Sequence, residues 1–165
     1  MCMQACAIRS AARGILIQDG RLLTVRYRDD RRGEFFVTPG GGQRKWETLH
    51  ETVKREMLEE AGVNVTVGRL RFVREFLGAT GEHNALADIH GLELFFECAV
   101  DGDAGQGAPA MGHEPDPDQI GVEWMGIRQL NDVRFFPRAM VEHLPVNGGA
   151  WPAPGTAPVY LGATR

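Results

Sequence analysis

A segment without glycine or proline, residues 47–61, constrains the fold more than any other part of this chain. Gly62 follows it directly, and glycine commonly ends a helix at this position, so the segment is predicted to be a helix. At 100° per residue, Leu49, Val53 and Met57 fall close together and mark a buried stripe. One face of this helix is therefore expected to lie against the core.

Three acidic residues of the predicted helix point toward the same face. Glu56 and Glu60 share the direction of the buried stripe and Glu59 lies at its edge, within an arc of about 100°. Like charges at these spacings oppose helix formation by about 0.2–0.5 kcal/mol per pair. A partly buried carboxylate without a counter-charge is costlier still. Arg55 is the one well-placed cation within the helix, and one arginine cannot neutralise three acids.

A divalent cation would neutralise this acidic cluster. Oxygen ligands without a cysteine or histidine cluster favour Mg²⁺ or Mn²⁺ over zinc. Mg²⁺ keeps coordination positions for water and phosphate oxygens, which indicates phosphate-ester or pyrophosphate chemistry. Gly40, Gly41 and Gly42 precede the helix and would let a backbone group approach such an ion closely. The alternative is an ordinary solvated helix face that is rich in glutamate.

Composition and charge narrow the possible partners and location. The chain has 165 residues, of which 43% are hydrophobic and 24% charged, so we expect one globular domain over residues 1–165. No apolar run reaches the roughly 20 residues of a membrane span, and no secretory signal is expected. Three cysteines are too few for a disulfide framework, which favours the cytoplasm. The net charge of −4 and the lack of a basic face argue against nucleic acid as a partner.

Strands dominate the rest of the predicted fold. They are expected at residues 11–17, 21–28, 34–38, 63–77, 92–100 and 120–127. A short helix is expected at 137–144. The segment 101–119 is rich in Gly, Pro and Asp and is long enough for a functional loop. A Pro/Gly-rich tail, 145–165, carries a β-like fragment at 159–161. The result is a mixed α/β domain.

The residues around the predicted helix resemble a known family. The Nudix box is reproduced over residues 41–63 without a mismatch, at Gly41, Glu47, Arg55, Glu56, Met57, Glu59, Glu60, Gly62 and Val63. The strand that runs into Pro39 and the later strand with Glu123 and Trp124 also look like this family. The resemblance implies an α/β/α sandwich with a mixed sheet and the Nudix helix at about 47–61. It also implies hydrolysis of a nucleoside diphosphate linked to another group, with Mg²⁺ or Mn²⁺.

The resemblance further implies roles for single residues. The metal would be bound by the carboxylates of Glu56, Glu59 and Glu60, and in some members also by a carbonyl, that of Gly40 here. Glu47 and Arg55 would form an ion pair that orients the site from beneath. These residues are therefore the predicted catalytic core.

The general base is left open between two sources. Some members of the family use the acid at the position of Glu56, whereas others use an acid on a later loop. In this chain we expect that loop at 101–119, where Glu114 is the first candidate and Asp118 the second.

Four residues are candidates for substrate contact, namely Arg26, Arg31, Arg44 and Trp46. The first two belong to an arginine cluster before the glycine segment, which is either a phosphate clamp or a solvated loop. Arg44 stands where many members carry Glu, and it could contact a phosphate. Trp46 stands where many carry Gly, and it could stack on a base.

We therefore expect a cytoplasmic, Mg²⁺-dependent pyrophosphohydrolase whose substrate is a nucleoside triphosphate or a nucleotide sugar. Hydrolysis of coenzyme A or another dinucleotide-type substrate is an alternative, because the sequence signatures that distinguish substrate classes within the family are incomplete in this chain. A nucleotide-sensing domain without turnover is a second alternative, and the complete set of helix acids argues against it. A plain interaction domain is a third. The family also suggests a homodimer.

Overall fold

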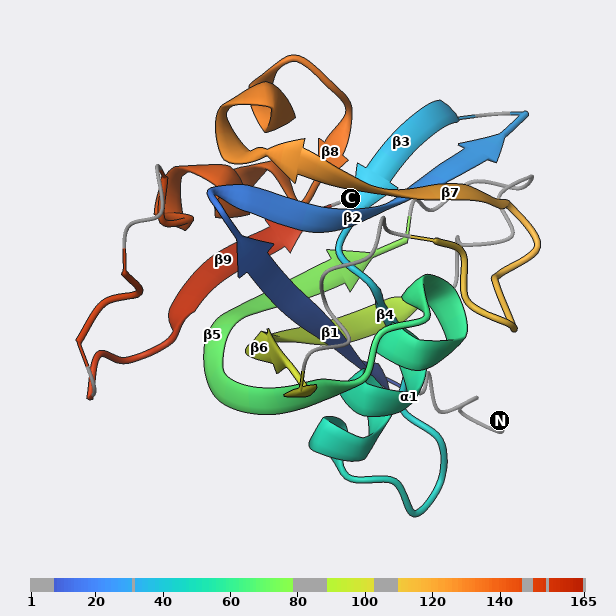
Figure 1. The fold of residues 1–165 in the computed structure, drawn as a ribbon. Helices are drawn as coiled ribbons and strands as arrows, with labels where there is room; N and C mark the ends of the chain where they lie inside the picture. Colours follow the sequence, from blue (N-terminus) through green and yellow to red (C-terminus); the bar gives the residue numbers. More distant parts are fainter. Residues whose placement is uncertain are drawn as a thin grey trace.

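The computed structural model shows a curled, mixed β-sheet with one α-helix packed against it, in the part of the chain that it describes (Figure 1). That part comprises residues 8–30, 32–78, 89–102, 110–146, 150–153 and 155–164. Its strands are β1 (Ile8–Gln18), β2 (Arg21–Asp29), β3 (Gly33–Val37), β4 (Gly40–Gly42), β5 (Val65–Leu77), β6 (His90–Val100), β7 (Gln119–Gly126), β8 (Phe135–Phe136) and β9 (Val159–Thr164). The sheet order is β8-β3-β2-β1-β6-β5-β9, with β4 paired to β1 and β7 to β2.

Strand β1 changes partners along its length. From Ile8 to Leu16 it pairs in parallel with β6, and Ile17 and Gln18 then pair with β2. Asp19 and Gly20 join β1 to β2 with positive φ angles of 49° and 71°, as a two-residue hairpin turn that follows the twist of its strands requires. The sheet thus has two parts, with β2, β3 and β7 above β1, β5 and β6 in the view of Figure 1.

The helix α1 spans Leu49–Ala61, within the predicted range. It begins two residues later than predicted because Thr48 has extended backbone and caps it, accepting from the backbone N–H of Glu51. Glu47 is therefore outside the helix. Gly62 ends α1 in the left-handed conformation, with φ of 66°, as its type predicts.

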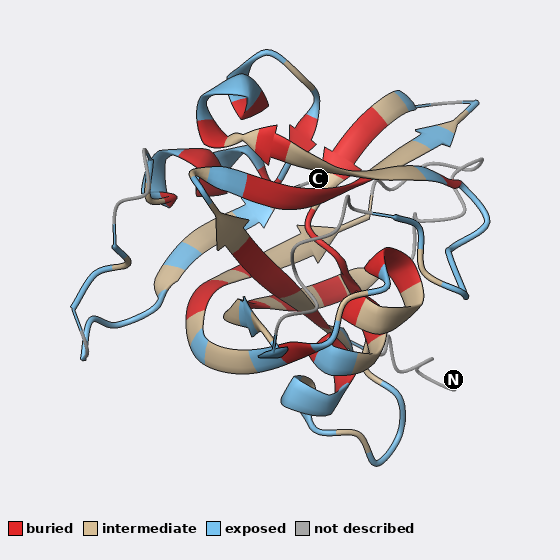
Figure 2. Cartoon of the chain, viewed as in Figure 1, coloured by how far each residue is buried: buried red, intermediate tan, exposed pale blue. Residues whose placement is uncertain are grey.

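The sheet is covered on both faces. Val53, Met57 and Ala61 of α1 pack on one face, and the 3₁₀ helices η2 (Ile127–Asn131) and η3 (Arg138–His143) pack on the other. The two faces of the sheet carry separate hydrophobic clusters. Because side chains alternate across a sheet, consecutive strand residues belong to different clusters, as Ile15 and Leu16 do. Figure 2 shows this buried interior running through the sheet and the inner face of α1.

The α/β class with a mixed sheet is confirmed. The layer opposite α1 is built from 3₁₀ turns, so the short helix predicted at 137–144 is the 3₁₀ helix η3. The predicted strands are present with shifted ends, and β9 includes the β-like fragment of the tail. Strand β4, in the glycine segment, was not predicted. Among the described helices, none is long and apolar enough to cross a membrane.

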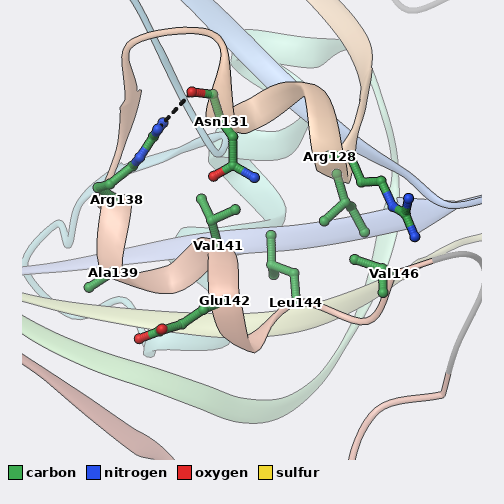
Figure 3. A pocket seen from close by; sticks show the side chains of 9 residues that line it. Arg128, Asn131, Arg138, Ala139, Val141, Glu142, Leu144 and Val146 are labelled. Atoms are coloured by element: carbon green, nitrogen blue, oxygen red, sulfur yellow. Dashed lines mark hydrogen bonds between the residues drawn. The ribbon is translucent and has the colours of Figure 1, made fainter.

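A cavity of about 490 Å³ opens beside η2 and η3 (Figure 3). Arg138 is one of the residues that line the cavity. Its guanidinium donates to the backbone carbonyls of Leu130, Asn131 and Val133 and so caps the C-terminal end of η2. None of the residues that line the cavity comes from α1. The cavity is therefore separate from the acidic helix.

A buried ion-pair network crosses three strands. The carboxylate of Glu93 on β6 lies between Arg13 of β1 and Arg74 of β5, with 3.0 Å between Arg13 Nε and Glu93 Oε1. Arg13 also donates through Nη1 to the carbonyls of Thr38 and Gly40, at 3.0 and 3.1 Å. Burial raises the pKa of Glu93, but the two arginines outweigh it and hold this pKa below its ordinary value. The network supports the glycine segment from beneath.

Candidate active site

Three acids of α1, Glu56, Glu59 and Glu60, lie near the glycine segment. Glu56 and Glu60 are 9% and 1% exposed, so both are withdrawn from solvent. The carboxylate of Glu56 packs on the backbone of Gly41, where a Cβ atom would lie 2.6 Å from Glu56 Oε1. A residue without a side chain is needed at this position for such a close approach.

Glu60 is held by hydrogen bonds on both carboxylate oxygens. Its Oε2 accepts from the backbone N–H of Gly40 at 2.8 Å, and its Oε1 accepts from the hydroxyl of Tyr27 at 2.5 Å. Burial nevertheless raises the pKa of Glu60 to about 7, because desolvation outweighs these two hydrogen bonds. An ionised Glu60 is thus costly in the protein alone.

Arg55 connects four groups of the site. Its Nη1 donates to Glu56 Oε1 at 2.6 Å and to Glu59 Oε2 at 2.9 Å. Its Nε and Nη2 donate to the carboxylate of Glu47 at 2.6 and 3.0 Å, and Nη2 also donates to the carbonyl of Gly42. The hydrogen bond from Arg55 lowers the pKa of Glu47 to about 2. The structure thus brings together Glu47 and Arg55, the ion pair that the family resemblance implied.

Arg55 does not offset the burial of the helix acids. Burial raises the pKa of Glu56 above its ordinary value in spite of the hydrogen bond from Arg55, and the charges of Glu59 and Asp116 raise it further. The pKa of Glu60 is raised as well. The cluster therefore favours a cation or protons, as the helix geometry indicated.

The loop that precedes β7 docks on the C-terminal end of α1. The backbone N–H groups of Gly112 and Glu114 donate to the carbonyls of Glu60 and Glu59, at 3.0 and 3.2 Å. A Cβ atom at Gly112 would lie 2.2 Å from the carbonyl oxygen of Glu59, so this position requires glycine. The loop is thereby fixed against the acidic helix.

This docking brings in an acid that sequence reasoning missed. Asp116 Oδ2 lies 3.1 Å from the hydroxyl oxygen of Tyr27, which also contacts Glu60. Glu114 and Asp118, the two predicted loop acids, contribute backbone contacts, in which the Asp118 carbonyl accepts from the N–H of Arg28. The sequence holds three acids at alternate positions here, and no local pattern distinguishes them.

Of the two arginines predicted to contact substrate before the glycine segment, Arg26 lies away from the helix acids and Arg31 lies outside the described residues. Arg26 pairs with Glu34 at the sheet surface and lies over the ring of Phe36. Because side chains alternate along a strand, Arg26 faces away from the side of β2 that carries Tyr27. Arg31 lies outside the residues that the structure describes.

The turn before α1 lies at the outer edge of the site. Arg44 Nη2 is 3.3 Å from Glu59 Oε1, and the Arg44 carbonyl accepts from the N–H of Glu47 at 3.1 Å. Trp46, the third residue of this turn, is 90% exposed and has a φ of 73°. Lys45 Nζ lies 5.1 Å from the centre of the Trp46 ring. Arg44 thus contacts an acid of α1, while the Trp46 ring is exposed beside the Lys45 ammonium.

The donor set of the site suits a hard divalent cation. The carboxylates of the helix acids and the Gly40 carbonyl are oxygen ligands of the kind that Mg²⁺ and Mn²⁺ prefer. The Gly40 carbonyl accepts one hydrogen bond from Arg13, which leaves a second lone pair. Across the described ranges, no three acidic, histidine or cysteine side chains converge as a metal-ligand cluster would. The oxygen ligands thus suit the cation, while the carboxylates of the helix acids are hydrogen-bonded to groups of the protein.

Comparisons with known proteins address the family directly. A family model described as NUDIX domain matches residues 8–144. No curated protein gives a significant match. Similar solved structures include a NUDIX hydrolase from Nitrosomonas europaea, with 15% identity over 82% of this chain and 85% of that one and a TM-score of 0.65. A MutT protein from Methanosarcina mazei Go1 has 18% identity, coverage of 82% and 88%, and a TM-score of 0.60. At these identities the solved structures show the fold.

Proposed function

The chain belongs to the NUDIX family, a family of hydrolases that act on pyrophosphate bonds, and we propose that it cleaves a nucleoside diphosphate linked to another group with the help of Mg²⁺ or Mn²⁺. The observation that carries this proposal is the uncompensated charge of the helix acids. Glu56 and Glu60 are buried with raised pKa values although Arg55, Tyr27 and the Gly40 N–H donate to them. A divalent cation would supply the missing charge.

The carboxylates of Glu56, Glu59 and Glu60 would hold the cation, with the Gly40 carbonyl as an additional ligand. When bound, the cation supplies positive charge for the phosphate oxygens and activates the attacking water. Water attacks one phosphorus of the diphosphate bridge, and the products are a nucleoside monophosphate and a second phosphorylated compound. Glu47 keeps Arg55 in place, which orients Glu56 and Glu59.

The proton of the attacking water goes to a carboxylate. Glu56 and the loop acid Glu114 remain the candidates from the sequence, with Asp118 after them. The position of Asp116, within 3.1 Å of the hydroxyl that also binds Glu60, adds it as a loop candidate. Separate Asp116→Asn and Glu114→Gln variants would separate these two acids by their effects on kcat.

We favour a nucleoside triphosphate or a nucleotide sugar as substrate, and we keep coenzyme A, other dinucleotides and a sensing role as alternatives. The test is release of phosphorylated product from a panel of nucleoside triphosphates, ADP-sugars, dinucleotides and coenzyme A. Turnover with Mg²⁺ or Mn²⁺ and none with EDTA is expected. Binding without turnover of every compound would instead support the sensing domain. A cytoplasmic location and a homodimer remain predictions of the sequence.

Trp46 is the residue through which we propose that the substrate's base is bound. Its backbone conformation suits glycine, and a non-glycine residue in this region costs on the order of 1 kcal/mol. Trp46→Gly is therefore expected to leave the melting temperature equal to that of the wild type or raise it slightly, while KM for a nucleotide rises several-fold. Steady-state kinetics and thermal unfolding measure both effects.

A second variant separates the ring from the backbone effect. Trp46→Phe keeps an aromatic face and should retain most of the nucleotide affinity, because stacking requires the ring. In the wild type, nucleotide binding is measured by the quenching of tryptophan fluorescence. In the variants, it is compared through KM. Equal KM values for the wild type, Trp46→Gly and Trp46→Phe would remove Trp46 from the substrate site.

A further inference from the structure

The ring of Tyr27 is fixed in the sheet. Tyr27 on β2 is the register partner of Phe35 on β3, and the two rings stack with centroids 5.5 Å apart and planes 11° from parallel. Phe35 is 5% exposed and contacts Phe136 edge to face. A stacked ring on a paired strand has little freedom to turn, so the position of its hydroxyl is set by the sheet.

The hydroxyl joins two elements that are far apart in the sequence. It lies 2.5 Å from Glu60 Oε1 on α1 and 3.1 Å from Asp116 Oδ2 on the loop before β7. Within the described residues, Tyr27 is the hydrogen-bond partner of the Asp116 carboxylate, whereas Glu60 also accepts from the Gly40 N–H. One side chain thus contacts both the helix acid and the loop acid.

We propose that Tyr27 is a positioning residue that holds Glu60 and Asp116 on either side of its hydroxyl and so sets the geometry of the cation site. The proposal rests on the function proposed above. A hydroxyl has one proton, so it donates to one of the two carboxylates at a time and leaves the other contact without a hydrogen atom. The hydroxyl can therefore offset the charge of only one of the two acids at a time.

The position of Tyr27 also links the docked loop to the sheet. The loop contacts α1 through backbone groups at Gly112 and Glu114. Directly after it, Gln119 at the start of β7 donates its side-chain amide to the Glu60 carbonyl at 2.8 Å. The sheet supports the loop as well, through the backbone N–H of Arg28, which donates to the Asp118 carbonyl, and through the contact between Tyr27 and Asp116. Loss of the hydroxyl should therefore loosen the loop on its sheet side without unfolding the domain.

The test compares the two tyrosines of the chain. Each donates to a glutamate at 2.5 Å, but Tyr160 bonds Glu75 on β5, away from the helix acids. Tyr27→Phe is expected to weaken Mn²⁺ binding, measured by electron paramagnetic resonance without substrate, by about 10–100-fold. It should lower kcat by a similar factor with little change in KM. Tyr160→Phe should change neither quantity.

Hydrogen exchange supplies a readout that needs neither metal nor substrate. Amides of residues 110–119 should exchange faster in Tyr27→Phe than in the wild type, with the rest of the domain unchanged. If loop exchange, Mn²⁺ affinity and kcat all match the wild type, the proposal is overturned. A general rise in exchange across the sheet would assign Tyr27 a merely structural role and would also overturn it. A wild-type protein without Mn²⁺ binding or turnover would refute the proposed function instead, and loop exchange alone would then decide on Tyr27.

Discussion

Replacement of Glu60 by glutamine is expected to lower turnover by on the order of 10³-fold, since a lost cation ligand removes several kcal/mol of charge stabilisation. The fold should survive. Burial raises the pKa of Glu60 to about 7, above its ordinary value, so its ionised form destabilises the metal-free protein at higher pH. A neutral amide of the same shape removes that cost. At pH 8 without metal, the free energy of unfolding of Glu60→Gln should equal or exceed that of the wild type.

Added Mn²⁺ should reverse the order of stability. A ligand that binds only the folded state raises the melting temperature by mass action, and the wild type should gain more than Glu60→Gln. Glu142→Gln is the matched control, because this acid lies on η3 and its side chain is 77% exposed. Glu142→Gln should match the wild type in turnover, in the free energy of unfolding without metal and in the rise of melting temperature with Mn²⁺. A fully active Glu60→Gln variant would contradict the role of Glu60 as a ligand.

The acidic helix could be predicted because its signals are local. Positions three and four residues apart share a face of any helix, so the common direction of Glu56, Glu59 and Glu60 follows from spacing alone. The end of the helix follows from the glycine after it. The start was misjudged by two residues because Thr48 caps the helix with extended backbone. That same cap leaves Glu47 free of the helix, where it reaches Arg55.

The remaining residues of the site depend on contacts between distant segments. Alternation along β2 separates Arg26 from Tyr27, but it does not tell which of them faces the helix acids. That choice is made by the tertiary fold, in which Tyr27 contacts Glu60 of α1 and Arg26 pairs with Glu34. The selection of Asp116 among three loop acids follows from the backbone contacts of Gly112 and Glu114 with the helix end. Neither feature leaves a periodic pattern in the sequence.

Truncation of Glu93 to alanine is expected to cost about 3–5 kcal/mol of unfolding free energy, because it leaves buried arginine charge without its partner. Glu93 is 8% exposed and lies between Arg13 and Arg74. The arginines hold its pKa below the ordinary value. The stabilisation is therefore complete above the unfolded pKa of about 4.5 and is lost as the pH falls through the lower folded pKa. Denaturant unfolding from pH 7 to pH 3 should show a smaller acid-induced loss in Glu93→Ala than in the wild type.

Glu97→Ala is the matched control on the same strand. Glu97 pairs with Arg71, but its side chain is 23% exposed, against 10% for Glu93, so water can replace more of the lost contact. An equal cost in the two variants would contradict the buried network. The network also reaches the site, because Arg13 donates to the Gly40 carbonyl and Gly40 donates to Glu60. Glu93→Ala should therefore weaken Mn²⁺ binding, and Glu97→Ala should not, although neither residue touches an acid of α1.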